Sequence, residues 1–210
     1  MVKIKKYLTK ADKFRDKISP EYAQFLRKKY RKEQWKKKVK QRVVDTLPLR
    51  LLTKYNTYNF EGLSKQKITS LYIYGNVGTG KTVLSAYYYV DFLKQLYLEQ
   101  SSFVSKTYHF VVFSKFMDYL QTDPNDSFDL MKQYMQCDLL VLDEFGAKKM
   151  TEYIYDRIYL IINERYLSML PTIINSNNTL AEIGEKFSDT RIIRRIEEDY
   201  ILIEKKPYKN

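Results

Sequence analysis

The chain has 210 residues, a formal net charge of +12 and 44% hydrophobic residues. This length accommodates one α/β domain with an appendage rather than two large domains. One cysteine excludes an internal disulfide and a cysteine zinc cluster, and one histidine makes a histidine metal site equally implausible. The sequence contains no apolar run of membrane-spanning length, and its N-terminus lacks the apolar stretch of a secretory signal. These features predict a cytoplasmic protein with no membrane partner.

The positive charge is concentrated near the N-terminus. Residues 1–44 contain 17 Lys and Arg against 4 Asp and Glu, whereas residues 45–210 contain 20 basic and 21 acidic residues. Residues 21–44 lack Gly and Pro and have apolar residues three to four apart, which predicts one or two basic amphipathic helices beginning near Pro20. We therefore expect residues 1–44 to form a helical arm that docks on a partner protein or on DNA, with Lys36, Lys37 and Lys38 as candidate nucleic-acid contacts. The alternative is a solvated helix in a lysine-rich protein.

Residues 45–67 change in character, because Pro48, Asn56, Asn59 and Gly62 divide them into short pieces. We expect a linker here, which could also form one wall of a ligand pocket. The remainder, residues 68–210, is predicted to be the main domain.

A glycine-rich segment follows the apolar run 71–74 and precedes a predicted helix that begins at about Lys81. Its pattern is G-x-x-x-x-G-K-T, in which glycines with positive φ let several backbone N–H groups converge on a phosphate chain at a helix N-terminus. Lys81 would reach the β- and γ-phosphates, and the Thr82 hydroxyl would lie on Mg²⁺. The predicted nucleotide-binding residues are Gly75, Asn76, Val77, Gly78, Thr79, Gly80, Lys81, Thr82 and Val83.

A second informative segment is the apolar run 139–142 followed by two acids. It predicts a central parallel strand, buried on both faces, with carboxylates at its C-terminal tip. Ligands of open α/β sheets bind beyond these tips, so Asp143 is predicted to lie near Mg²⁺ and Glu144 to polarise an attacking water. Lys148 and Lys149, in the following loop, are further candidate DNA contacts.

The other elements complete an alternating pattern. Strands are predicted at 109–113, 172–175 and 200–204, a short helix at 115–120 capped by Ser114, and a loop at 121–126. Helices are predicted at 151–169 and 189–196, and a short helix or turn at 179–187. Alternating strands and helices favour a parallel sheet with helices on its faces.

With these motifs in place, residues 47–204 resemble the AAA+ ATPases of the DnaC/DnaI helicase-loader and IstB-like group. The resemblance rests on G-N-V-G-T-G-K-T, L-L-V-L-D-E-F-G, I-N-E-R-Y, P-T-I-I-N-S-N and R-I-I-R-R-I, in that order. It implies an α/β P-loop NTPase fold of the AAA+ type: a parallel five-stranded sheet flanked by helices, with a reduced or absent C-terminal lid.

The resemblance also implies roles for single residues. Lys81 and Thr82 match the Walker A motif, Asp143 and Glu144 match Walker B, and Asn177 matches sensor 1. Arg195 matches the arginine finger, with Arg191 as the nearest alternative, because Arg194 stands where the family often has Ser. An arginine finger acts on a neighbour's nucleotide, which implies self-association or docking on a related ATPase.

The function expected from the resemblance is an ATP- and Mg²⁺-dependent ATPase that loads a replicative helicase onto single-stranded DNA. An IstB-type transposition helper acting on duplex DNA is the main alternative. A nucleoside or nucleotide kinase is a further alternative, although it would not need the acidic pair, Asn177 and the arginines in this order. The last alternative is a decoy that binds a helicase and blocks it without hydrolysing ATP.

Overall fold

The computed structural model describes residues 20–57, 69–99, 107–122, 126–187 and 189–206. The chain divides into two compact units, and the boundary lies at Val43 and Val44, inside the helix α2 (Pro20–Thr46). Pro20 occupies the first position of α2, where its missing N–H costs no helical hydrogen bond. The basic segment is therefore one continuous helix over its described length, and Lys36, Lys37 and Lys38 are all exposed on it.

The second unit is built on a parallel sheet of five strands in the order β2-β3-β4-β1-β5. The fold class predicted from the sequence is confirmed. The strands are β1 (Leu71–Tyr74), β2 (Tyr108–Val112), β3 (Leu139–Phe145), β4 (Thr172–Ser176) and β5 (Ile201–Glu204).

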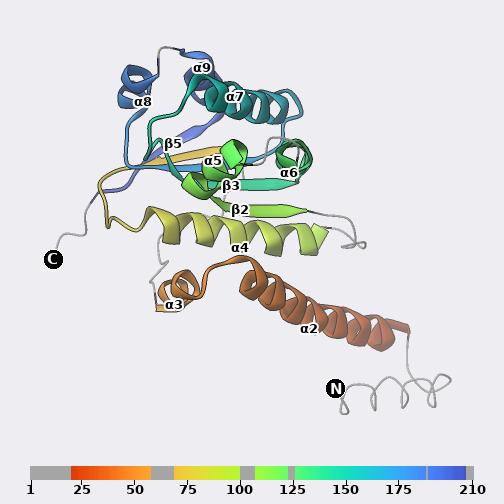
Figure 1. Ribbon diagram of the computed structural model, residues 1–210. Helices are drawn as coiled ribbons and strands as arrows, with labels where there is room; N and C mark the ends of the chain where they lie inside the picture. Colours follow the sequence, from red (N-terminus) through yellow and green to blue (C-terminus); the bar gives the residue numbers. More distant parts are fainter. Residues whose placement is uncertain (1–19, 58–68, 100–106, 123–125, 188, 207–210) are drawn as a thin grey trace. The chain divides into compact units, whose positions relative to one another are not determined.

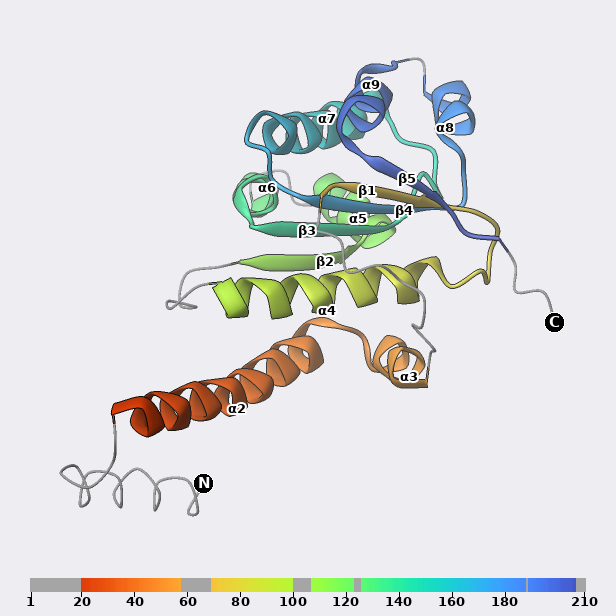
Figure 2. The same cartoon turned by 180° about the vertical axis from the view of Figure 1, so that it is seen from behind.

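Helices cover both faces of this sheet, as Figure 1 and, from behind, Figure 2 show. One face carries α4 (Lys81–Glu99), and the short helix α3 (Leu49–Thr57) packs against α4. The opposite face carries α7 and α9, and its core joins sheet residues such as Leu140, Leu142 and Ile174 to helical residues such as Ile158 and Ile192. The remaining helices are α5 (Phe113–Thr122), α6 (Asp126–Gln136), α7 (Glu152–Leu167), α8 (Leu180–Lys186) and α9 (Arg191–Asp199).

Three predicted elements differ from the structure. Ser114 is not a cap, because α5 already begins at Phe113. The predicted loop 121–126 is helical at both ends, within α5 and at the start of α6, while residues 123–125 lie outside the described residues. The predicted linker contains α3, a helix with Leu51 buried. Among the described helices, none is long and apolar enough to span a membrane.

Candidate nucleotide-binding site

The glycine-rich loop connects β1 to α4 at the carboxyl edge of the sheet. Gly75, Gly78 and Gly80 all have positive φ, at 142°, 82° and 87°. These values lie in the region that glycine adopts without a Cβ clash, so the conformational requirement inferred from the sequence is met. Residues with side chains fill the rest of the loop: Asn76 and Val77 are exposed, whereas Thr79 is buried and its Oγ1 donates to the Asn76 carbonyl at 2.9 Å.

Gly75 is required for a second reason, which is packing. A Cβ on Gly75 would lie 2.2 Å from the carbonyl oxygen of Lys205, the residue that follows β5. The backbone N–H of Lys205 donates to the Tyr74 carbonyl at 2.7 Å, so this close approach is fixed by the β1–β5 pairing. The start of the loop is thus held directly against the last strand.

Lys81, the first residue of α4, is folded back over the loop. Its Nζ donates to the carbonyls of Gly75 and Asn76, both at 2.8 Å, and the residue is buried. Burial lowers the pKa of the Lys81 amine, and the negative charge of Asp143 opposes that shift. The ammonium group is therefore held above the turn of the loop, where the loop's N–H groups and the helix N-terminus favour an anion.

Asp143, on β3, joins this group from across the sheet. The Thr82 hydroxyl donates to Asp143 Oδ1 at 3.0 Å, and Asn175 Nδ2 donates to the same oxygen at 2.8 Å. Burial raises the pKa of the Asp143 carboxyl, while the bonds from Asn175 and Thr82 act in the opposite direction. A hydroxyl oxygen next to a carboxylate is a donor set that suits Mg²⁺, so Thr82 and Asp143 are the residues that could hold this ion.

Glu144 has an unusual backbone. Its φ is +63°, although it is not glycine, and the β3–β4 register shifts between Leu142 and Phe145. Glu144 is exposed while Asp143 and Phe145 on either side are buried. Non-glycine residues in this conformation cost on the order of 1 kcal/mol and concentrate at functional sites. The irregular backbone presents Glu144 to the cavity instead of leaving it on a regular strand.

These groups surround a cavity of about 470 Å³ at the carboxyl edge of the sheet. That volume is in the range of ligand pockets. Its walls come from the loop and α4, from the tips of β2, β3 and β4, and from α3 with the residue before it. The lining residues are Pro48, Arg50, Leu51, Lys54, Val77, Gly78, Gly80, Lys81, Thr82, Val83, Phe110, Val112, Asp143, Glu144, Asn175, Ser176 and Asn177.

Asn177 lies at this cavity and is exposed just beyond β4. Hydrogen bonds hold the residues before and after it in the sequence. The Ser176 hydroxyl donates to the Phe145 carbonyl at 2.7 Å, and the Tyr72 hydroxyl donates to the Asn178 carbonyl at 2.8 Å. The backbone on either side of Asn177 is therefore fixed, and Asn177 and Glu144 line the same cavity.

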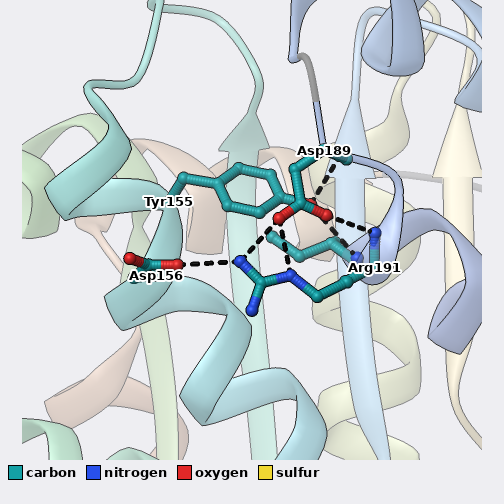
Figure 3. Close-up of polar contacts among 5 residues, drawn as sticks. Tyr155, Asp156, Asp189 and Arg191 are labelled. Atoms are coloured by element: carbon teal, nitrogen blue, oxygen red, sulfur yellow. Dashed lines mark hydrogen bonds and ion pairs between the residues drawn. The ribbon is translucent and has the colours of Figure 1, made fainter.

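The candidate finger arginines lie away from the cavity, on α9. Arg191 forms ion pairs with Asp189 at 2.5 Å and with Asp156 of α7 at 2.9 Å, as Figure 3 shows. These two carboxylates raise the pKa of Arg191, and its guanidinium lies 4.3 Å from the ring centre of Tyr159. Arg191 is thus held within its own subunit.

Arg195 is held in a similar way, because it donates to Asn163 at 3.0 Å and pairs with Glu198 at 3.0 Å. Arg194 is exposed, and its backbone N–H donates to the Thr190 carbonyl at 3.0 Å. The structure brings neither Arg191 nor Arg195 to the cavity of this chain, and the arginine-finger assignment stays a prediction.

The candidate DNA contacts after β3 are exposed. Lys148 pairs with Asp118 of α5 at 3.2 Å, and both side chains are more than half exposed. Lys149 is also exposed. These lysines lie in the turn that follows the Glu144 strand tip.

Sequence reasoning missed two sets of site residues. Asn175 was passed over in favour of Asn177, although both belong to one polar strand end. The sequence predicts that residues 45–67 could form one wall of the pocket, and α3 does line it, but only the amphipathic spacing of residues 49–57 could have indicated the helix that carries Arg50 and Lys54.

The fold is an α/β domain with a five-stranded parallel sheet and a glycine-rich loop between β1 and α4. Among solved structures, the chain is similar to that of DnaI, with a TM-score of 0.56 and 20% identity over 75% of this chain and 79% of that one. It is also similar to the DnaC helicase loader, with a TM-score of 0.52 and 23% identity over 75% of this chain and 87% of that one.

A third similar structure is the replication initiator DnaA bound to AMPPCP and single-stranded DNA. The TM-score is 0.55 and the identity 20%, over 75% of this chain and 44% of that one. No family profile and no curated protein matches the chain. These likenesses confirm the fold that the sequence resemblance implied.

Proposed function

We propose that this protein binds and hydrolyses ATP with Mg²⁺ and loads a replicative helicase onto single-stranded DNA. The observation that carries the proposal is the meeting of Lys81, Thr82 and Asp143 at one cavity, with the Thr82 hydroxyl 3.0 Å from the Asp143 carboxylate. The fold shared with DnaI, with the DnaC helicase loader and with AMPPCP-bound DnaA supports the replication role.

Each residue has a defined task in this proposal. The loop N–H groups and the Lys81 ammonium bind the phosphates, while Thr82 and Asp143 hold Mg²⁺. Bound Mg²⁺ would supply positive charge beside the β- and γ-phosphate oxygens. Glu144 orients the attacking water and accepts its proton, and Asn177 contacts the γ-phosphate or that water. A neighbouring subunit's arginine, from Arg191 or Arg195, would offset the charge that develops on the γ-phosphoryl group.

The nucleotide part of the proposal is tested by the Lys81→Ala variant. The variant loses the buried cation over the loop, so we expect nucleotide binding to disappear while the fold persists. Isothermal titration with ATP and Mg²⁺ measures the loss, and Lys149→Ala, an exposed lysine outside the cavity, is the control. Wild-type affinity in Lys81→Ala would contradict the assignment of this cavity to ATP.

The loader part is tested by co-purification from host lysate in the presence of ATP, with wild-type protein and Lys81→Ala as baits. A replicative helicase retained by the wild type and lost by the variant supports loading. A transposase in its place would favour the IstB-type alternative.

The basic arm is tested with single-stranded DNA. If Lys36, Lys37 and Lys38 contact phosphates, their replacement by alanine should weaken binding and lower the slope of log K against log salt by about 2. Fluorescence anisotropy at several salt concentrations measures this slope. An unchanged slope would assign the arm to protein docking instead.

A further inference from the structure

A buried chain of hydrogen bonds links α4 to the Asp143 carboxylate through β4. Ser85 Oγ donates to Asn175 Oδ1, and Asn175 Nδ2 donates to Asp143 Oδ1 at 2.8 Å. Ser85 is 0% exposed, Asn175 1% and Asp143 6%. Three elements that are distant in sequence therefore meet through buried side chains, of which Asn175 and Asp143 also line the cavity.

The direction of this chain is fixed by chemistry. A carboxylate only accepts hydrogen bonds, so the Asn175 amide must present its NH₂ group to Asp143. Its carbonyl oxygen then faces Ser85, whose hydroxyl has a proton to donate. The reversed amide would place two acceptors, Asn175 Oδ1 and the Asp143 carboxylate, against each other. The carboxylate thus selects the amide orientation, and the Ser85 hydroxyl donates to the carbonyl oxygen that this orientation turns toward α4.

The two side-chain donors to Asp143 converge on one oxygen. Thr82 and Asn175 both donate to Oδ1, from α4 and from β4. Among the described residues, no side chain donates to Oδ2. The backbone N–H of Glu144 also bonds to this carboxyl, and the carboxyl lines the cavity, so these donors restrain its rotation where it faces a ligand.

We propose that Asn175, whose carbonyl oxygen is held by the Ser85 hydroxyl, is a positioning residue that sets the Asp143 carboxylate for hydrated Mg²⁺. This inference rests on the proposed nucleotide function. Outer residues of this kind typically change metal affinity or activity by 10- to 100-fold when they are removed. Other buried hydroxyls of β4 have different partners: Thr172 accepts from Arg165, and Ser176 donates to the Phe145 carbonyl. Only the Asn175 position connects β4 to the carboxylate.

The test is a Mg²⁺ titration of ATP hydrolysis by the full chain, with nucleotide affinity measured separately in EDTA. Asn175→Leu keeps the branched shape and removes the donor, so the half-saturating Mg²⁺ concentration should rise by about tenfold or more. Ser85→Ala leaves the Asn175 carbonyl oxygen without its donor, so that the amide is held less firmly, and should raise this concentration by a smaller factor. Affinity in EDTA should stay within about twofold, because Mg²⁺ is absent from that measurement.

The double variant Ser85→Ala/Asn175→Leu tests whether Ser85 acts on Asp143 through Asn175, which we call the relay, or whether the two substitutions cause independent defects. If Ser85 acts through Asn175, Ser85→Ala adds nothing to the Mg²⁺ requirement once Asn175→Leu is present. The control is Ser70→Ala, which removes a buried hydroxyl that accepts from the Thr172 N–H at the opposite edge of the sheet. It should lower stability and leave the Mg²⁺ requirement unchanged.

An unchanged Mg²⁺ requirement in Asn175→Leu, with hydrolysis intact, would overturn the inference and leave the ATPase proposal standing. Absence of hydrolysis and of nucleotide binding in the wild type would instead overturn the ATPase proposal. If Asn175→Leu does not fold, Ser85→Ala decides alone: a raised Mg²⁺ requirement supports the relay, and a wild-type value refutes it.

Discussion

Two buried charged side chains lie at opposite edges of the sheet and differ in how they are satisfied. Arg165 of α7 is 0% exposed, and its guanidinium donates to the carbonyls of Tyr134 and Cys137 at 2.7 Å. It also donates to the Pro171 carbonyl at 2.7 Å and to Thr172 Oγ1 at 2.8 Å. Asp143, at the carboxyl edge, has two side-chain donors on one oxygen and lines a cavity.

The difference shows how structural and functional charges can be told apart. Burial lowers the pKa of Arg165, yet carbonyl oxygens at the end of α6, just before β3 and just before β4 accept from its guanidinium. The group is therefore satisfied within the protein and holds these segments together. The Asp143 carboxylate is fixed in direction but left open on the cavity side. We call the edge at Arg165 the closed edge and the carboxyl edge at Asp143, where the cavity lies, the open edge. Substitutions at the closed edge should change stability, and substitutions at the open edge should change nucleotide binding or hydrolysis.

The largest effect is expected at the open edge, from Glu144→Gln. The amide keeps the size of the side chain but cannot accept a proton, so kcat should fall by roughly 10²- to 10⁴-fold. Nucleotide affinity and thermal stability should remain close to wild type, because Glu144 is exposed. Steady-state phosphate release, titration and melting measure the three quantities. Hydrolysis at the wild-type rate would remove Glu144 from this role.

The next effect belongs to the closed edge, in Arg165→Met. Methionine fills part of the volume but leaves several buried carbonyl oxygens without donors, each costing about 1–3 kcal/mol. The free energy of unfolding should fall by about 3 kcal/mol or more, which corresponds to roughly 10 °C in Tm for a chain of this size. Denaturant unfolding measures it.

The contrast between the edges requires that folded Arg165→Met bind ATP as the wild type does. Titration below its melting temperature is the check. A large loss of affinity in the folded variant would mean that the two edges are coupled.

The smallest effect is expected for the N-terminal cap of α8, whose contribution to stability can be measured by substitution. Thr179 caps α8 in a capping box, accepting from the Glu182 N–H while Glu182 accepts from the Thr179 N–H. Thr179→Ala should cost about 1 kcal/mol. Thr190, the residue before α9, makes no such side-chain bond, so Thr190→Ala is the matched control and should change stability by less than about 0.5 kcal/mol. Equal losses in both would show that the cap bond contributes nothing.

The sequence predicted most strands and the candidate site because local patterns determine them. The glycine loop, the acid pair after a buried strand and the helix starting at Pro20 are all signals within a few residues. The sequence does not predict α6, because the polar run with Asp123 and Pro124 before it is typical of a loop. It does not predict α3 either, because Pro48 interrupts that segment.

Other features depend on tertiary contacts that no local pattern records. In the sequence, Arg165 stands out only as part of the motif I-N-E-R-Y. Its structural role depends on carbonyl groups of three other segments, to which its guanidinium donates. The positive φ of Glu144 follows from the register shift between β3 and β4. Asn175 and Ser85 are ordinary residues in sequence, and only the fold brings them to Asp143.

The contact between Gly75 and Lys205 also bears on the order of events during synthesis. The peptide that opens the glycine loop reaches its final surroundings only after β5 has paired with β1, because Lys205 lies against Gly75 and bonds to the Tyr74 carbonyl. A nascent chain that has not yet emerged past Lys205 therefore has an unfinished loop. On the ribosome, the capacity to hold a ligand at this loop would be acquired only after β5 and Lys205 have emerged and paired with β1.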